Sequence, residues 1–97
     1  MELFQAVYLF NKRAKEDAII SPSHIALYTA FLYFWTIQKQ VPISITRKEV
    51  MQIAHVKGIA TYQKCIKELH NNKYIIYKPS FDPRGKSLIY FNNLLEI

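Results

Sequence analysis

The side chains of this chain best suited to chemistry are basic ones, and they are concentrated between residues 43 and 86. Nine lysines and arginines in this segment stand against the acids Glu49, Glu68 and Asp82, which gives the segment a net charge of +6. The remainder of the chain is balanced, so the segment holds the whole excess charge of the protein. Clustered Lys and Arg are typical of a protein that contacts a polyanion. The nine are Arg47, Lys48, Lys57, Lys64, Lys67, Lys73, Lys78, Arg84 and Lys86.

Candidates for catalysis or metal binding are sparse. Cys65 lies between Tyr62 and Leu69 on the apolar side of an expected helix, where a small buried core residue is the ordinary role. His70 follows Cys65 at about 140° around a helix. His24 belongs to another element, so no set of metal ligands is expected to converge. The sequence also has no glycine-rich phosphate loop and no paired carboxylates at catalytic spacing. We therefore expect neither an enzyme nor a bound cofactor or metal.

The composition limits the class of protein further. Ninety-seven residues allow one domain, and a hydrophobic content of 51% is enough for one compact core. The single cysteine excludes an internal disulfide, which suits a reducing cytosol. Glu2 and Gln5 do not fit the start of a signal peptide. The most apolar stretch, residues 25–37, is too short to span a bilayer. We expect a cytoplasmic protein without membrane contact.

Hydrophobic periodicity predicts two helices in the first half, over residues 3–15 and from Pro22 to about Lys39. Ser21 before Pro22 is a start signal, because serine caps free N–H groups and proline loses no hydrogen bond at the first helical position. The second helix is apolar on nearly every face, and we expect that so small a domain cannot cover it alone. Its aromatic residues are therefore predicted to serve both a core and a homodimer interface. They are Tyr28, Phe31, Phe34 and Trp35.

The second half predicts two helices separated by a short turn. Residues 43–45 alternate like a short strand, and Thr46 with Glu49 forms a capping box that begins a helix ending near His55. Residues 60–72 have apolar positions three or four apart, which predicts the second helix of the pair. Two helices joined in this way are typical of a helix-turn-helix.

A hairpin is expected after the helix pair. Residues 74–78 and 87–91 are rich in β-forming residues and enclose a polar loop, residues 79–86. Residues 92–97 are predicted to form one turn of a last helix. The fold expected is mainly α with a small β-hairpin.

One segment resembles a known family. Residues 61–75, TYQKCIKELHNNKYI, resemble the recognition helix and first wing strand of bacterial winged helix-turn-helix transcriptional regulators, although Lys73 stands where the family usually has Gly. The resemblance covers residues 43–91. The stretch from residue 20 through Trp35 to the hairpin is also similar to small winged-helix proteins of Bacteroidetes mobile elements. The apolar positions of the family motif are filled by Tyr62, Cys65, Ile66 and Leu69.

The resemblance implies a single winged-helix domain over residues 1–97. Residues 1–42 would supply additional N-terminal helices, part of the core and the dimer interface, and residues 43–91 the helix-turn-helix and its wing. A twofold dimer would place two recognition helices on a pseudo-palindrome. The function implied is sequence-specific binding of double-stranded DNA, as a transcriptional regulator or as an accessory factor of a mobile element.

The expected DNA contacts follow from position in the motif. Gln63 is suited to adenine, and Lys64 or Lys67 to guanine, with the helix in the major groove. The residues at the start of the first motif helix would clamp a phosphate, and those at the wing tip would touch phosphate or the minor groove. The expected contacts are Arg47, Lys48, Lys57, Ile59, Thr61, Gln63, Lys64, Lys67, Arg84 and Lys86.

Three other functions remain open from the sequence. A winged helix also serves as a protein–protein module, in which case the basic surface is incidental. A nucleic-acid-processing accessory would bind single strands by stacking bases on Tyr74, Tyr77 or Phe81. A sensor would hold a small molecule between aromatic helices, although nothing in the sequence selects a ligand.

Overall fold

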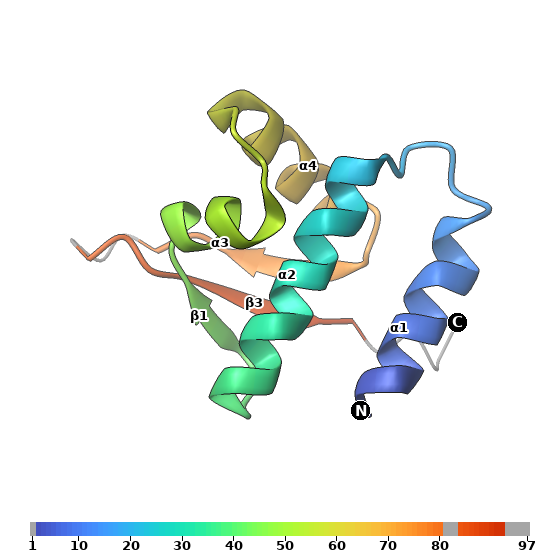
Figure 1. Cartoon of the computed structure of the whole chain (residues 1–97), viewed down its shortest axis with the longest axis horizontal. Coiled ribbons are helices and arrows are strands. Elements are labelled where there is room, and N and C mark those ends of the chain that lie inside the picture. Colours follow the sequence, from blue (N-terminus) through green and yellow to red (C-terminus); the bar gives the residue numbers. More distant parts are fainter. Residues whose placement is uncertain (1, 81–83, 93–97) are drawn as a thin grey trace.

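A computed structural model describes residues 2–80 and 84–92, which form a mainly helical chain with a small antiparallel sheet (Figure 1). Each predicted helix and strand lies within one residue of its expected bounds. The turn predicted for residues 92–97 falls almost wholly outside the described residues. The elements are α1 (Leu3–Ala14), α2 (Pro22–Gln38), β1 (Ile43–Ile45), α3 (Arg47–Ala54), α4 (Ile59–Asn71), β2 (Ile75–Lys78) and β3 (Ser87–Phe91).

The sheet has three strands rather than the two of the predicted hairpin. Its order is β1-β3-β2, with both neighbours of β3 antiparallel. Ile43 of β1 and Tyr77 of β2 both lie opposite Ile89, whose side chain is fully buried. Because β1 leads directly into α3, this pairing places the start of α3 beside the hairpin.

The core is built around α2, which contacts α3, α4 and β1. On its other side Tyr28 stacks on Phe10 of α1, with ring centroids 4.0 Å apart. Phe91 of β3 meets the ring of Tyr28 edge-on at 5.8 Å. Among the described residues, no helix has both the length and the apolar character needed to cross a bilayer.

The expectation that the aromatic residues of α2 also form a dimer interface does not fit their burial in the single chain. Tyr28, Phe31 and Phe34 are at most 7% exposed within the single chain, and Trp35 is partly buried against the core. Three of the four aromatic residues assigned to a dimer interface therefore have no surface to offer, whereas one side of α2, along residues 25, 29, 33 and 37, stays exposed. The large apolar side chains that α2 does expose are Ile25, Tyr33 and Ile37.

Local caps explain where the helices begin. The N–H of Glu49 donates to Thr46 Oγ1 at 3.2 Å, and the Thr46 hydroxyl donates to Glu49 Oε1 at 2.8 Å, as the capping box predicts. At the start of α2 the N–H of Ser21 donates to His24 Nδ1 at 3.0 Å. His24 thus takes the place that Glu or Gln usually holds in a capping box.

The corner between α4 and β2 is held by α1. Lys73 has a φ of 66°, the left-handed backbone that glycine adopts more easily than lysine. The guanidinium of Arg13 donates to the carbonyl of Lys73 at 3.0 Å and to the carbonyl of Asn72, and it lies 4.1 Å from the centre of the Tyr74 ring. The Tyr74 hydroxyl donates to Asp17 Oδ2 at 2.8 Å.

Candidate functional site

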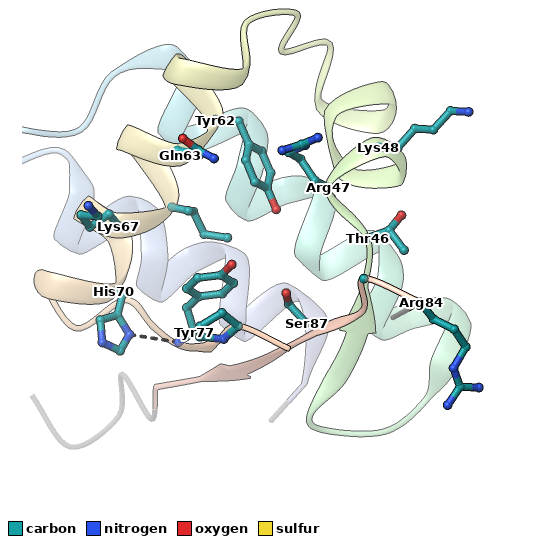
Figure 2. Close-up of a pocket in the computed structure, with 13 residues that line it drawn as sticks. Thr46, Arg47, Lys48, Tyr62, Gln63, Lys67, His70, Tyr77, Arg84 and Ser87 are labelled. Carbon is teal, nitrogen blue, oxygen red and sulfur yellow. Dashed lines mark hydrogen bonds between the residues drawn. The ribbon is translucent and has the colours of Figure 1, made fainter. Parts of the chain in front are cut away.

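A groove of about 760 Å³ lies between α3, α4 and the β2–β3 hairpin (Figure 2). We call it the α4–hairpin groove. None of the described residues that line it is acidic. The lining residues are Thr46, Arg47, Lys48, Tyr62, Gln63, Ile66, Lys67, His70, Tyr77, Pro79, Arg84, Gly85 and Ser87.

Three elements bring the polar rim of this groove together. The Thr46 cap begins α3 at the mouth, so Arg47 and Lys48 stand in its first turn. On α4, Gln63 and Lys67 lie one turn apart on the groove side. Arg84 comes from the hairpin. All of these side chains are exposed, and four of them are cations that a polyanion can reach.

The floor of the groove is apolar and aromatic. Tyr62 and Ile66 are only 4% and 3% exposed, and Tyr77 is partly buried. In Figure 2 the Tyr62 and Tyr77 side chains both point into the groove. The backbone N–H of Tyr77 donates to His70 Nδ1 at 3.0 Å, which fixes β2 against the end of α4.

Electrostatics keep the Tyr62 hydroxyl neutral. Burial raises the pKa of Tyr62 to about 12, and the nearby Tyr77 adds to the rise, whereas Arg47 opposes it. A phenol with this pKa keeps its proton at physiological pH, so Tyr62 offers both a hydrogen-bond donor and an acceptor beside the cations.

The structure divides the predicted DNA contacts into two groups. The groove-lining group comes together from α3, α4 and the hairpin, and consists of Arg47, Lys48, Gln63, Lys67 and Arg84. The other group is exposed but lies outside the groove, and consists of Lys57, Ile59, Thr61, Lys64 and Lys86.

Helix geometry explains the division on α4. Thr61 is about 160° around the helix from Gln63, so these two side chains lie on opposite flanks. Lys64 lies on the outer edge, about 100° from Gln63. Lys86 lines a second hollow on the hairpin, together with Lys78.

Eight of the described groove residues were not among the predicted contacts, and three of these eight are aromatic. Tyr62 was assigned only to the core, His70 only weighed as a metal ligand, and Tyr77 considered only for base stacking. The spacing of Gln63 and Lys67 one turn apart, with His70 a further turn on, was a signal for a shared side of α4. No pattern in the neighbouring sequence indicates that β2 packs beside this side of α4.

A second cluster corrects the expectation that His24 lies apart from Cys65. Because α2 packs on α4, ligand atoms of His24, Cys65 and Glu68 lie within 4.8 Å of one another. His24 Nε2 is 3.0 Å from Glu68 Oε1, and His24 Nδ1 accepts the N–H of Ser21, which leaves the ring proton on Nε2 facing the carboxylate. A metal at Nε2 would have to displace this proton. Burial, followed by the charge of Glu68, raises the pKa of the Cys65 thiol and disfavours the thiolate that metals require.

The cluster has a consequence for the groove. Glu68 is the acidic residue of α4, and it lies about 140° around the helix from Gln63. His24 holds its carboxylate on the α2 side. The negative charge of α4 is therefore kept away from the cationic rim.

Comparisons of the chain with protein-family models, with curated proteins and with solved structures found no match. The chemistry of the groove therefore carries the functional argument.

Proposed function

We propose that this chain is a winged helix-turn-helix domain that binds double-stranded DNA. In this proposal α3 and α4 are the helix-turn-helix, α4 is the recognition helix, and β2 with β3 is the wing. The order of elements and the strand order β1-β3-β2 support it. The observation that carries it is that cations from α3, α4 and the hairpin surround one groove whose described lining has no acid.

The exposed edge of α4 fits the major groove of DNA. Lys64 is exposed on this edge, and Gln63 and Lys67 lie beside it on the groove side. Gln63 can read adenine with two hydrogen bonds and Lys64 can meet the acceptors of guanine, whereas phosphate contacts from Lys48, Lys67 and Arg84 would set the register. Such binding suits a cytoplasmic transcriptional regulator or an accessory factor of a mobile element.

A homodimer through the aromatic residues of α2 is no part of this proposal. Tyr28, Phe31 and Phe34 are buried in the core of one chain, and separating them from it would unfold the domain.

The first prediction concerns how the affinity for DNA depends on the salt concentration. A labelled random-sequence duplex, titrated with the protein at several salt concentrations and followed by fluorescence anisotropy, should bind with an affinity that falls linearly on a log–log plot. Each neutralised phosphate contributes a slope of about −0.9. Lys67→Gln should weaken binding and reduce the slope by about one, because it removes one cation that would neutralise a phosphate.

Lys15→Gln is the matched control, since Lys15 is an exposed cation on α1 outside the groove. It removes the same charge and should leave the slope nearly unchanged. Absence of duplex binding at low salt would refute the proposal. Equal effects of the two variants would mean that general charge attraction, rather than the groove, binds the DNA. Salt-independent binding to an acidic protein would support the protein–protein alternative.

A further inference from the structure

We propose that the α4–hairpin groove holds one unpaired nucleotide, so that the protein binds a DNA duplex carrying a single-stranded extension more tightly than a blunt duplex. This inference rests on the proposed function, because the duplex itself would lie on the exposed edge of α4. It adds a second contact, made inside the groove by the strand that leaves the duplex.

The size of the groove favours a single nucleotide. Its volume of about 760 Å³ lies within the range of pockets that enclose small molecules. One base with its sugar and phosphate fits inside this space, whereas a duplex would lie across its rim, on the exposed edges of α3, α4 and the hairpin.

The chemistry of the groove matches the two halves of a nucleotide. Arg47, which lies beside Tyr62 in Figure 2, suits a phosphate. The Tyr77 ring, which points into the groove, offers a flat apolar surface for a base. An acidic peptide would satisfy the cations and would leave this aromatic floor without a planar partner.

Hydrogen-bonding groups stand where a base edge would lie. The neutral hydroxyl of Tyr62 offers both a donor and an acceptor at the groove. Ser87 of β3 adds a hydroxyl from the opposite wall.

The structure also selects among the aromatic residues considered for stacking. Tyr74 is fully buried, with its ring against Phe10 and Arg13, so it cannot meet a base. Phe81 lies outside the described residues. Tyr77 lines the groove and is only partly buried. The stacking role therefore falls to Tyr77.

The test compares three labelled duplexes of one sequence: blunt, with a three-nucleotide 3′ extension, and with a three-nucleotide 5′ extension. We expect one of the extended duplexes to bind on the order of tenfold more tightly than the blunt one, the increment typical of stacking one base on an aromatic ring. Tyr77→Ala should bring this ratio close to one, whereas Tyr77→Phe, which keeps the ring, should preserve it.

Folding is controlled separately, because Tyr77 belongs to β2. Its hydrogen bond to His70 uses the backbone N–H and survives substitution of the side chain. Thermal unfolding of each variant checks the fold. If Tyr77→Ala is unstable, Tyr77→Leu takes its place, because it keeps apolar bulk without a flat ring. It should likewise bring the ratio of extended to blunt affinity close to one.

The outcomes separate this inference from the proposed function. Equal binding of blunt and extended duplexes by the wild type would overturn the inference and leave duplex binding intact. A ratio that persists in a folded Tyr77→Ala variant would overturn it as well. Free dAMP, titrated alone, tests the other source of the same chemistry: Tyr77-dependent binding of dAMP without any preference for extended duplexes would make the groove a free-nucleotide site and overturn the strand-end inference. Failure to bind any duplex would remove both proposals.

Discussion

Two buried tyrosines differ in whether the hydroxyl group has a hydrogen-bond partner. Tyr28 is 1% exposed, and no described residue gives its hydroxyl a hydrogen-bond partner. Tyr74 is fully buried and donates to the Asp17 carboxylate at 2.8 Å. A buried hydroxyl without a partner lowers stability by about 1–3 kcal/mol, whereas a hydrogen bond to a charged group contributes about as much.

These situations predict opposite effects of one substitution. Tyr28→Phe should raise the free energy of unfolding by about 1 kcal/mol, because it removes an unpaired hydroxyl and keeps the ring that stacks on Phe10. Tyr74→Phe should lower it by about 1–3 kcal/mol. Urea denaturation with unchanged m-values measures both. A loss of stability in Tyr28→Phe similar to that in Tyr74→Phe would show that the Tyr28 hydroxyl is satisfied in solution.

The sequence assigned residues whose role follows from a few neighbouring positions, and did not assign residues whose role depends on packing between distant segments. The caps at Ser21 and Thr46 were predicted because a capping signal lies within four residues of chain. The meeting of His24 with Glu68, 44 positions away, was not predicted, because it depends on how α2 packs against α4. Tyr77 was found only as one of three stacking candidates, since only the packed structure shows which of them reaches the groove.

At the scale of elements, periodicity predicted every described helix and strand because each follows from a local pattern of apolar residues. Two arrangements needed the tertiary structure. The first is the addition of β1 to the hairpin, which brings α3 to the groove. The second is the covering of α2 by the other helices and the sheet, which leaves its aromatic residues in the core. A helix that is apolar on all sides is expected to be buried, but its sequence does not say which elements bury it.

The attachment of α1 to the α4–β2 corner gives a prediction at the same scale. Arg13 bonds two successive carbonyls with a planar fork and covers the Tyr74 ring. Arg13→Ala should therefore lower the free energy of unfolding by about 1.5–3 kcal/mol, the range for hydrogen bonds to a charged group. Arg13→Lys should recover only part of it, because an ammonium lacks the fork.

Lys12→Ala is the control for this change, since Lys12 is the exposed neighbour of Arg13 and its ammonium lies 5.8 Å from the centre of the Tyr8 ring. Its effect should stay within about 0.5 kcal/mol in the same urea titration. Equal losses for Lys12→Ala and Arg13→Ala would mean that loss of helix charge, rather than the two carbonyl bonds, weakens the protein.

At the scale of the whole molecule, three tyrosines couple folding to alkaline pH. Burial raises the pKa of Tyr28, Tyr62 and Tyr74 to about 12, and the bond to Asp17 adds to the rise at Tyr74. Tyrosines of an unfolded chain release their protons near pH 10. Between these pH values the folded chain holds protons that the unfolded chain has lost, so this contribution to stability is complete below about pH 10 and falls as the pH rises toward 12.

Tyr28 and Tyr74 both pack against Phe10 of α1, whereas Tyr62 lies on the floor of the groove. No single local opening exposes all of them, so their phenolate absorbance near 295 nm should appear together with the loss of helical circular dichroism between about pH 10 and pH 12. Tyr28→Phe should make the alkaline transition less steep, because one coupled proton is removed. Phenolate formation by all seven tyrosines of the chain before any loss of circular dichroism would contradict the coupling, since the buried hydroxyls would then ionise within the folded protein.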